Sequence, residues 1–299
     1  MSSPLKFKQL GLIGCGLMGA SFAMALQKNS LVDKVVGYSP SQRTRERALQ
    51  LGVIQQAVLS ASEAVQGCDI VLLAVPVSRT AECMQAIAST LPPDCLLMDV
   101  GSTKTDVVAA ATAHLGERLN CFVPAHPIAG KAQAGVDHAE AGLYQDRRAI
   151  LTPMAQTDSA QLQRAQQVWT AIGSHISLMN PQDHDATFAA VSHVPHLLAF
   201  AAVNALSAQD QGPAFLKMAG PGFRDFSRIA ASDPAVWRDI LSANQVEVLQ
   251  QTRHFRAALD TFEKAIQHHD LEQLQLLIEN ASRVRSAWTL QSGQTEHDD

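Results

Sequence analysis

Ser102 and His126 carry side chains that can take part in acid–base chemistry, and each follows an apolar segment. Residues 95–100 and 121–125 have the continuous apolar character of buried parallel strands. Because open sheets of this kind bind ligands outside the carboxyl ends of their strands, we expect both side chains at a ligand site. A histidine there can accept a hydroxyl proton near neutral pH, which makes His126 the candidate base.

Each of these two residues also has a purely structural interpretation. Ser102 could equally cap the helix that is expected after it. His126 could lie in a surface turn, since Pro127 and Gly130 shape a turn whatever the histidine does. The sequence leaves both interpretations open.

Three polar side chains lie along one predicted helix that is otherwise apolar, residues 180–207. His184, Ser192 and His196 follow one another at steps of eight and four, which places them roughly on one face. Pro195 should kink the helix or free a carbonyl beside them. A polar stripe on an apolar helix favours a ligand cleft over a single buried core histidine.

Arg228 lies in a segment rich in turn residues, 219–239. Its guanidinium could hold a carboxylate through two parallel hydrogen bonds, whereas Arg224 has a ready partner in Asp225. The sequence has no metal-ligand spacing and no G-x-S-x-G motif. A histidine base with an arginine clamp therefore favours hydride transfer from an alcohol that carries a carboxylate.

A glycine motif at residues 14–19 indicates the cofactor for such a reaction. An apolar strand at 9–13 runs into the motif, and apolar positions with helical spacing follow it. The glycines allow a tight turn, close approach of a pyrophosphate and close packing of the helix, whose first N–H groups would bind the phosphates. The predicted cofactor-binding residues are Gly14, Cys15, Gly16, Leu17, Met18 and Gly19, with Val75 and Pro76 after the strand at 69–76, and Ser102.

Ser39 occupies the position at which an NAD-binding unit usually has an acidic residue. An acid would repel a 2′-phosphate, whereas the Ser39 hydroxyl and the Arg43 guanidinium would hold one. NADP is therefore the predicted cofactor, with NAD as the alternative. The other interpretation is that Arg43, Arg45 and Arg47 form the solvated face of a helix.

The order of these segments predicts an α/β fold, in which an N-terminal Rossmann-type doubly wound sheet is followed by an all-α C-terminal domain. Strand patterns end near residue 179, and only helical patterns follow. We predict a dinucleotide-binding domain at residues 1–179 and a helical substrate-binding and dimerisation domain at 180–299.

The composition argues against several other classes of protein. The 299 residues include 23 Lys and Arg against 28 Asp and Glu, a net charge of -5, which argues against nucleic-acid binding. The five cysteines lack metal-binding spacing, so we expect reduced thiols and no metal. Without a leader or an uninterrupted apolar span, the chain is predicted to be cytoplasmic and free of the membrane. The apolar helix at 180–207 predicts a homodimer.

The sequence resembles the prephenate/arogenate (cyclohexadienyl) dehydrogenase family of tyrosine biosynthesis. The matching segments are GLIGCGLMG at 11–19, DVGSTK at 99–104, HPIAG at 126–130, SHVPH at 192–196 and GFRDFSRIAASDPAVWRDI at 222–240. The resemblance implies an oxidative decarboxylation, of prephenate to 4-hydroxyphenylpyruvate or of arogenate to tyrosine. Hydride would pass from C4 of the cyclohexadiene ring to the nicotinamide while CO2 leaves C1.

The resemblance also implies roles for the candidate residues. His126 would bond the C4 hydroxyl and take its developing positive charge, and Ser102 would bridge that histidine, the hydroxyl and the cofactor. Arg228 would hold a substrate carboxylate. The substrate pocket would be lined by His184, Ser192 and His196.

One segment departs from the family pattern. Many prephenate-using relatives have a polar and acidic pair after HPIAG, where this chain has Lys131 and Ala132. Without this acid, its roles in gating the site and in recognising the substrate side chain are in doubt for this chain. Gln133 could partly substitute for it. In this feature the chain resembles the arogenate-using, NADP-linked members, which agrees with Ser39.

Two other functions fit parts of the sequence. A β-hydroxyacid dehydrogenase shares the glycine turn and a helical second domain, but it depends on a lysine in the first interdomain helix. This chain has no lysine in residues 180–216. A non-catalytic NADP-binding sensor would require the polar stripe and Arg228 to be coincidental.

Overall fold

The computed structural model describes residues 5–131 and 133–289, which form two compact units. The first unit runs to Asp185 and also contains Ala231–Asn244, and the second contains Ala186–Ala230 and the described residues from 245 onward. The predicted domain boundary between residues 179 and 180 stays a prediction. It differs from this division in where the segments 180–185 and 231–244 belong.

The first unit is built on a six-stranded parallel sheet with the order β3-β2-β1-β4-β5-β6. Every residue of β4 and β5 is buried, as expected for parallel strands that are covered on both faces. The strand order reverses between β1 and β4, where such sheets bind ligands. The strands are β1 (Phe7–Ile13), β2 (Val32–Tyr38), β3 (Gln56–Ala57), β4 (Ile70–Leu73), β5 (Leu96–Asp99) and β6 (Phe122–Val123).

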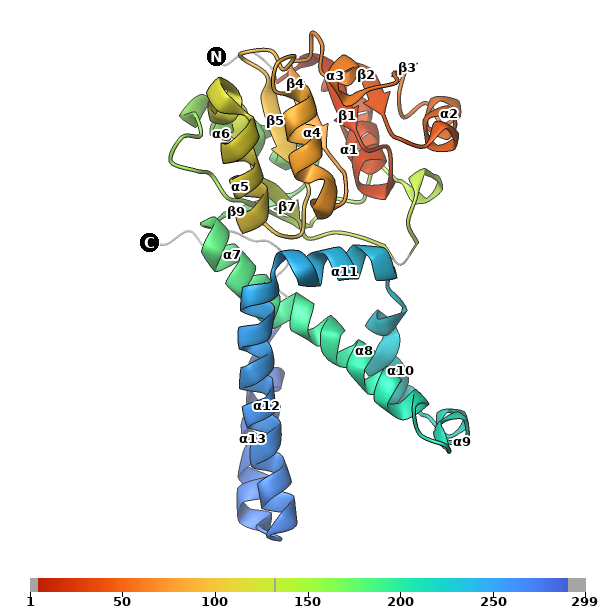
Figure 1. Ribbon diagram of the computed structural model, residues 1–299, viewed down its shortest axis with the longest axis vertical. Coiled ribbons are helices and arrows are strands. Elements are labelled where there is room, and N and C mark those ends of the chain that lie inside the picture. The colour runs from red at the N-terminus through yellow and green to blue at the C-terminus, as the bar shows by residue number, and fades with distance from the viewer. Residues whose placement is uncertain (1–4, 132, 290–299) are drawn as a thin grey trace. The chain divides into compact units, whose positions relative to one another are not determined.

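Helices cover both faces of this sheet, which confirms the predicted Rossmann-type fold (Figure 1). Leu12 and Ile13, adjacent in β1, point to opposite faces and belong to different core clusters. One cluster includes side chains of α1 and α6, and the other includes side chains of α3, α4 and α5. The helices are α1 (Leu17–Lys28), α2 (Gln42–Gln50), α3 (Ala61–Ala64), α4 (Thr80–Ile87), α5 (Thr105–His114) and α6 (Ser159–Ala171).

A second sheet of three strands carries His126. Its strands are β7 (Ala125–Pro127), β8 (Arg148–Leu151) and β9 (His175–Leu178), with β7 antiparallel to β8 and β8 parallel to β9. The strand predicted at 121–125 is divided at Pro124 into β6 and β7. Because His126 pairs with Ile150 inside the second sheet, the surface-turn interpretation is wrong.

The helix α11 (Pro234–Ala243) belongs to the first unit, although it follows the helical region in sequence. It is separated from the next helix, α12, at Asn244. Asp233 caps α11 by accepting hydrogen bonds from the N–H groups two and three residues further on. The Asn244 amide donates to the carbonyl of Asp185 at 2.8 Å, which fixes the end of α11 within this unit.

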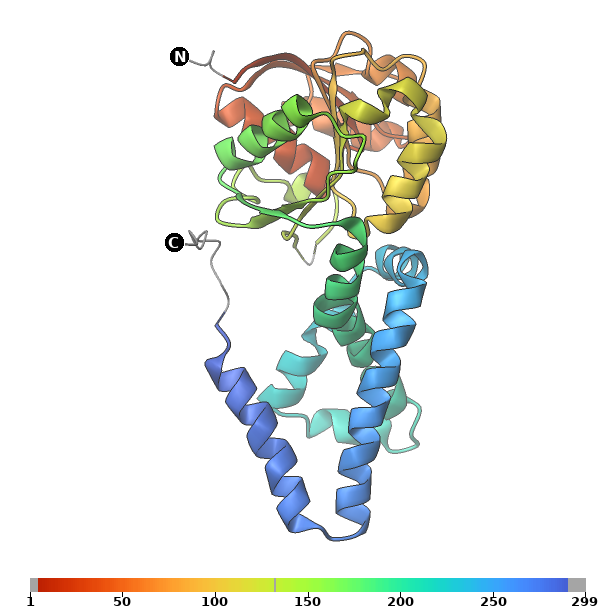
Figure 2. The same cartoon turned by 90° about the vertical axis from the view of Figure 1, so that its left-hand side faces the viewer.

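The second unit contains helices and no strand among its described residues, as predicted, and α12 and α13 form a hairpin whose two helices spread apart from the turn (Figure 2). The helix α7 (Pro181–Phe188) leads into it. A π-helical turn, Ala189–His193, then precedes α8. This wide turn accompanies Pro195, so the predicted disturbance of the helix is confirmed. The remaining helices are α8 (Val194–Ser207), α9 (Gly212–Lys217), α10 (Pro221–Ser227), α12 (Gln245–Gln267) and α13 (Leu271–Ala287).

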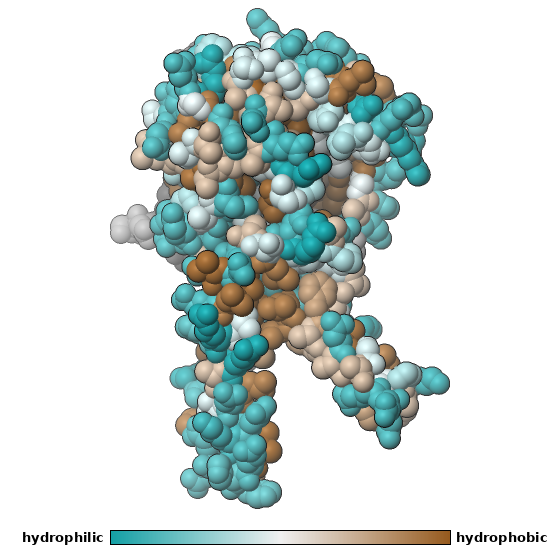
Figure 3. All heavy atoms as spheres, in the orientation of Figure 1, coloured by the Kyte–Doolittle hydropathy of each residue, from teal (hydrophilic) through white to brown (hydrophobic). Residues whose placement is uncertain are grey.

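The hairpin of α12 and α13 leaves large apolar side chains exposed. Brown, apolar residues are visible among the teal ones along this unit (Figure 3). Ten exposed large apolar or aromatic residues belong to these helices or follow α13: Val246, Leu249, Phe255, Leu259, Ile266, Leu271, Leu276, Ile278, Val284 and Trp288. An apolar surface of this kind commonly marks an interface.

By length and composition alone, one helix in the described part of the chain, Pro181–Ser207, could cross a membrane. The expectation that every apolar run is too short for a span is therefore not met by this helix. Core helices of water-soluble proteins share the same length and apolar character. The absence of membrane association stays a prediction.

Candidate active site

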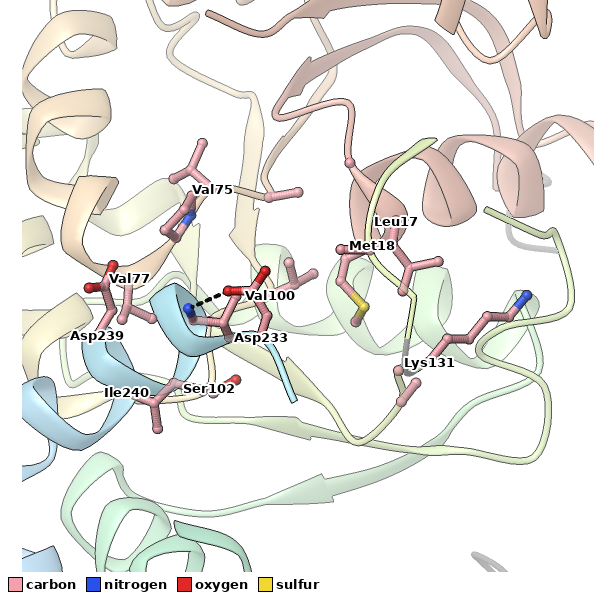
Figure 4. Close-up of a pocket in the computed structure, with 18 of the residues that line it drawn as sticks. Leu17, Met18, Val75, Val77, Val100, Ser102, Lys131, Asp233, Asp239 and Ile240 are labelled. Carbon is pink, nitrogen blue, oxygen red and sulfur yellow. Dashed lines mark hydrogen bonds between the residues drawn. The ribbon is translucent and has the colours of Figure 1, made fainter. Parts of the chain in front are cut away.

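The first unit contains a cavity of about 480 Å³ at the carboxyl ends of β4 and β5. Its walls come from the glycine turn before α1, the segments after β4 and β5, β7, the loop that follows β7, and α11. Figure 4 shows Leu17 and Met18 of α1, Val75 after β4, and Val100 and Ser102 after β5 around this space. The cavity therefore lies where the strand order of the sheet predicts a ligand site.

The glycine turn has the shape that a dinucleotide requires. Gly14 has a φ of 101°, and a Cβ on it would collide with the carbonyl of Ala74. A Cβ on Gly19 would collide with the carbonyl of Gly14, whereas open space lies beside Gly16. Gly16 is the N-cap of α1 and makes no side-chain cap, so phosphate oxygens can reach the first N–H groups. A nicotinamide dinucleotide fits this turn and the adjoining cavity.

The other predicted cofactor-binding residues fall into two places. Leu17, Met18, Val75, Pro76 and Ser102 line the cavity. The Cys15 side chain instead points into the core, where burial raises the pKa of its thiol to about 12, so only its backbone is available to a ligand.

The position that is expected to bind the adenosine ribose of the cofactor lies at the end of β2. Ser39 is buried there, and the Arg45 guanidinium donates to its carbonyl oxygen at 2.5 Å. Ser41 caps α2 by accepting from the N–H of Thr44, and Arg43 in the first turn of α2 is exposed. Arg45 is therefore committed to the backbone, whereas the Arg43 side chain can reach an anion.

Ser102 does not cap the following helix. Lys104 is the N-cap of α5, and no side chain of its own segment caps the helix. The N–H groups of Lys104 and Thr105 instead donate to the two carboxylate oxygens of Asp185, each at 2.8 Å. The capping interpretation of Ser102 is thus wrong, and its side chain lines the cavity.

His126 lies at the cavity wall and begins a chain of buried hydrogen bonds. Its Nδ1 is 2.8 Å from Nε2 of His184, and Nδ1 of His184 is 2.8 Å from Oδ1 of Asp185. The side chain of His184 has no exposed surface. It was predicted to contact substrate, but both of its ring nitrogens are engaged with protein groups here.

The charge states of His184 and Asp185 follow from their surroundings. Burial lowers the pKa of His184, and the nearby Lys104 charge acts in the same direction, which favours the neutral ring. Burial opposes ionisation of Asp185, but hydrogen bonds from His184, Thr105 and Lys104 outweigh it and hold the pKa of Asp185 below its usual value. A neutral histidine is thus bonded to a carboxylate.

A buried ion pair holds the backbone next to His126. Lys104 Nζ is 2.5 Å from Oδ2 of Asp99 and donates to the carbonyl of Ala125 at 2.8 Å. Oδ1 of Asp99 accepts from the N–H of Ala125 at 2.9 Å. Both backbone polar groups of the residue before His126 are therefore fixed by one pair of charges.

The loop after β7 carries the residues expected to read the substrate side chain. Lys131 and Gln133 line the cavity, and Ala132 lies outside the described residues. The Lys131 side chain extends away from Val75, Val100 and Ser102, which follow β4 and β5 (Figure 4). Its Nζ bonds Oε2 of Glu140 at 2.9 Å and the carbonyl of His138 at 3.0 Å.

The remaining predicted residues belong to the second unit. Nδ1 of His196 donates to the carbonyl of Ser192 at 2.9 Å. Burial lowers the pKa of His196, and the positive charge of Arg228 adds to this effect. Arg224 bonds Asp225, as its sequence neighbour suggested, while Arg228 is exposed.

Comparison with known proteins shows the family of the chain. Residues 22–178 match the model of the prephenate dehydrogenase nucleotide-binding domain, and residues 180–280 match the prephenate dehydrogenase dimerization domain. The cyclohexadienyl dehydrogenase of Zymomonas mobilis is 32% identical over 294 residues, 98% of each chain. The chain belongs to the prephenate dehydrogenase family.

Solved structures of the family have the same fold. The prephenate dehydrogenase of Aquifex aeolicus, in complex with hydroxyphenyl propionate and NAD+, matches with a TM-score of 0.88 and 32% identity, over 95% of this chain and 99% of that one. Synechocystis arogenate dehydrogenase matches with a TM-score of 0.78 and 29% identity, over 94% and 100% of the two chains.

As a member of the prephenate dehydrogenase family, the protein is an oxidoreductase with a nicotinamide cofactor and a small-molecule substrate. No role was predicted from the sequence for Asp185, Lys104 or Asp99, although the last two lie in the DVGSTK segment. A signal for Asp185 was its place directly after His184. The contribution of α11 to the cavity wall was not predicted either, although most of this helix lies in the matching segment at 222–240.

Proposed function

We propose that this enzyme catalyses the oxidative decarboxylation of a cyclohexadiene with a hydroxyl at C4 and a carboxylate at C1, with arogenate and NADP as its preferred pair. The observation that carries the proposal is that Ser102 and His126 line the same cavity as the glycine turn. A hydrogen-bonding hydroxyl and an imidazole thus stand where a bound nicotinamide would meet an alcohol. The β-hydroxyacid dehydrogenase and sensor alternatives are not favoured by the family match.

In this mechanism the bound nicotinamide supplies the hydride acceptor. His126 holds the proton of the C4 hydroxyl while the hydride departs, and Ser102 orients the same hydroxyl. The electron pair of the bond between C1 and its carboxylate closes the aromatic ring, CO2 leaves, and the phenol of the product keeps the proton. Aromatisation makes the step favourable, so the protein mainly has to position the hydroxyl and exclude water.

We propose that Arg228 binds the substrate carboxylate, because a guanidinium offers two parallel donors to a carboxylate. Ser192 and His196, which bond each other through the Ser192 carbonyl, complete the proposed substrate contacts. The buried position of His184 favours a positioning role behind His126 over a substrate contact.

Arogenate differs from prephenate in carrying an amino group on its side chain. The ion pair with Glu140 offsets the charge of Lys131, which would otherwise repel that amino group. Gln133 at the cavity wall offers a neutral amide to the same side chain. These two observations support a preference for arogenate.

The preference for NADP rests on Ser39 and Arg43. The end of β2 presents a serine in place of an acid, and the adjoining Arg43 side chain is exposed. A 2′-phosphate would find a hydroxyl and a guanidinium there, whereas the 2′-hydroxyl of NAD would lack its usual carboxylate partner.

We further propose a homodimer that packs through the helical unit. The exposed apolar side chains of α12 and α13 support this, as does the description of the matching family model as a dimerization domain. Light scattering at low micromolar concentration should give twice the mass of one chain. A single-chain mass would refute the dimer. A cytoplasmic location stays a prediction.

The experiment that tests the proposed function compares four reactions of the purified protein: prephenate or arogenate, each with NAD or NADP. Formation of reduced cofactor should be fastest with arogenate and NADP. Faster turnover of prephenate would refute the proposal that the loop after β7 favours arogenate. Faster reaction with NAD would refute the proposal that Ser39 favours NADP. If reduced cofactor is not formed with any of the four pairs, the proposed function is overturned and the non-catalytic sensor is favoured.

A further inference from the structure

We propose that His184 and Asp185 are positioning residues that fix the tautomer of His126, so that Nε2 is the unprotonated ring nitrogen offered to the substrate hydroxyl. This inference rests on the proposed function of His126 as the group that holds the hydroxyl proton. It assigns no substrate contact to His184 or Asp185. They act through the ring of His126.

The chain of hydrogen bonds begins at Asp185. Oδ1 of this carboxylate accepts from the N–H of Lys104, and Oδ2 accepts from the N–H of Thr105, at the N-terminus of the ten-residue helix α5. The unpaired N–H groups at a helix start favour a negative charge. Asp185 is therefore ionised, and an ionised carboxylate can only accept hydrogen bonds.

The protonation of His184 follows from this carboxylate. Because Asp185 only accepts, Nδ1 of His184 must carry the proton of their 2.8 Å hydrogen bond. His184 is fully buried, and the ammonium of Lys104 lies nearby, so a second proton on the ring is disfavoured. Nε2 of neutral His184 is then an acceptor.

The tautomer of His126 is the last link. Nε2 of His184 accepts, so Nδ1 of His126 donates across the 2.8 Å between them. A neutral imidazole has one ring proton, which leaves Nε2 of His126 unprotonated, on the edge of the ring opposite the bond to His184. His126 lines the cavity, and this nitrogen can accept the hydrogen bond of the substrate hydroxyl.

The neighbouring charges do not disturb this assignment. The ammonium of Lys104 is neutralised by Asp99, and both of these side chains are buried. Asp106 in the first turn of α5 is the other acidic group near this end of the helix, and burial raises its pKa toward the neutral form. Asp185 is thus the carboxylate that meets His184.

The decisive variant is Asp185→Asn. With its oxygen in the place of Oδ2, the new amide keeps accepting from the N–H of Thr105, and its NH2 group takes the place of Oδ1, which faces His184. The NH2 group would donate to Nδ1 of His184, Nε2 of His184 would then donate to Nδ1 of His126, and Nε2 of His126 would carry the proton. The direction of every bond in the chain is reversed, and of the two cap bonds the one from Thr105 is retained while the one from Lys104 is lost.

The test combines nuclear magnetic resonance of ¹⁵N-labelled histidine with steady-state kinetics. The signals of His126 are assigned by their loss in His126→Asn. In the unaltered protein we expect a protonated Nδ1 and an unprotonated Nε2, and in Asp185→Asn we expect the reverse. With whichever substrate and cofactor react fastest, kcat should fall by about 10²- to 10⁴-fold and KM should stay within a few-fold, as when a supporting carboxylate in a protease triad becomes an amide.

Asp183→Asn is the matched control, because Asp183 is an exposed carboxylate in the same turn of α7 and bonds Asn180. It should leave the tautomer of His126 and kcat as they are. A protonated Nε2 of His126 in the unaltered protein, or a kcat of Asp185→Asn within threefold of the unaltered value, would overturn the proposal. The tautomer is measured without turnover. A failure of this proposal can therefore be distinguished from a failure of the proposed reaction.

A second pair of variants keeps the proposal testable if Asp185→Asn does not fold. In His184→Gln the amide NH2 can donate to Asp185 while the amide oxygen accepts from Nδ1 of His126, which preserves the direction of the chain. His184→Met has a similar length but makes neither bond. We expect kcat to be at least tenfold higher for the glutamine variant than for the methionine variant, and equal values would count against the proposal.

Discussion

The ammonium of Lys104 lies 2.5 Å from the carboxylate of Asp99, and these side chains are 0% and 3% exposed. The pair also holds the carbonyl and the N–H of Ala125, one residue before His126. It therefore joins the end of β5 to β7 and fixes the strand that presents the candidate base. The desolvation of two charges is costly, and it is offset here by the ion pair itself and by hydrogen bonds of both side chains to the backbone.

Lys104→Met should strongly destabilise the protein, because it leaves the Asp99 carboxylate buried without its partner. We expect the free energy of unfolding to fall by about 3–5 kcal/mol, the usual cost of breaking a buried ion pair. Urea denaturation would measure it, with Lys131→Met as a control for a partly exposed lysine that pairs with Glu140. A loss below about 1 kcal/mol, typical of an exposed pair, would show that Asp99 is satisfied in another way.

Asp185 should contribute stability that depends on pH. Because its folded pKa is depressed, this contribution is present above the unfolded value of about 3.9 and is lost as the pH falls through the folded pKa. The difference in unfolding free energy between the unaltered protein and Asp185→Asn should therefore shrink as the pH falls below about 4. Urea denaturation from pH 7 to pH 3 would measure it, and Asp183→Asn corrects for the loss of one carboxylate. A difference that grows toward low pH would contradict the direction of the pKa shift.

The sequence predicted those parts of the site that follow from local patterns and from sheet topology. The glycine turn follows from residue type, and the placement of Ser102 and His126 follows from the rule that strand ends gather at one edge of a parallel sheet. Pro124, which has no N–H to donate, lies where the predicted strand divides into β6 and β7. The consequence, a second sheet that carries His126, depends on pairing with Ile150 and has no local signature.

The missed residues act through contacts between distant parts of the sequence. Asp185 caps a helix that begins 80 residues earlier, and a cap supplied by another segment leaves no capping motif at the helix itself. From the sequence, Lys104 is a charged residue at the start of a predicted helix and would be expected at the surface. In the fold it is completely buried beside Asp99.

His126→Asn should lower turnover more than binding. The variant loses the ring that holds the hydroxyl proton as the hydride leaves, so kcat should fall by about 10²- to 10⁴-fold, the usual contribution of a general base. KM should change by no more than a few-fold, since Asn still fills part of the cavity wall and can hydrogen-bond. Steady-state kinetics with the preferred substrate would measure both. A large rise in KM with an unchanged kcat would remove His126 from the chemical step and make it a binding residue.

Arg228→Ala should raise KM. A charge-assisted hydrogen bond contributes about 1.5–3 kcal/mol, so its loss predicts a rise of about 10- to 150-fold in KM with a smaller change in kcat. Arg224→Ala is the matched control, because that exposed arginine of the same segment bonds Asp225. Arg228→Lys should recover only part of the binding, since an ammonium lacks the planar pair of donors. Equal effects of the Arg224 and Arg228 variants would remove Arg228 from the substrate site.

Ser39→Asp should reverse the cofactor preference. The new carboxylate would bond the 2′-hydroxyl of NAD and repel the 2′-phosphate of NADP, so the ratio of kcat/KM for NADP to that for NAD should fall by at least about tenfold, equivalent to 1.4 kcal/mol. Arg43→Gln should lower the same ratio by removing a phosphate ligand. Arg47→Gln serves as the control on the same helix, because its guanidinium is 2.6 Å from Asp137. If the ratio stays constant in the Ser39 and Arg43 variants, the 2′-phosphate is not read at the end of β2.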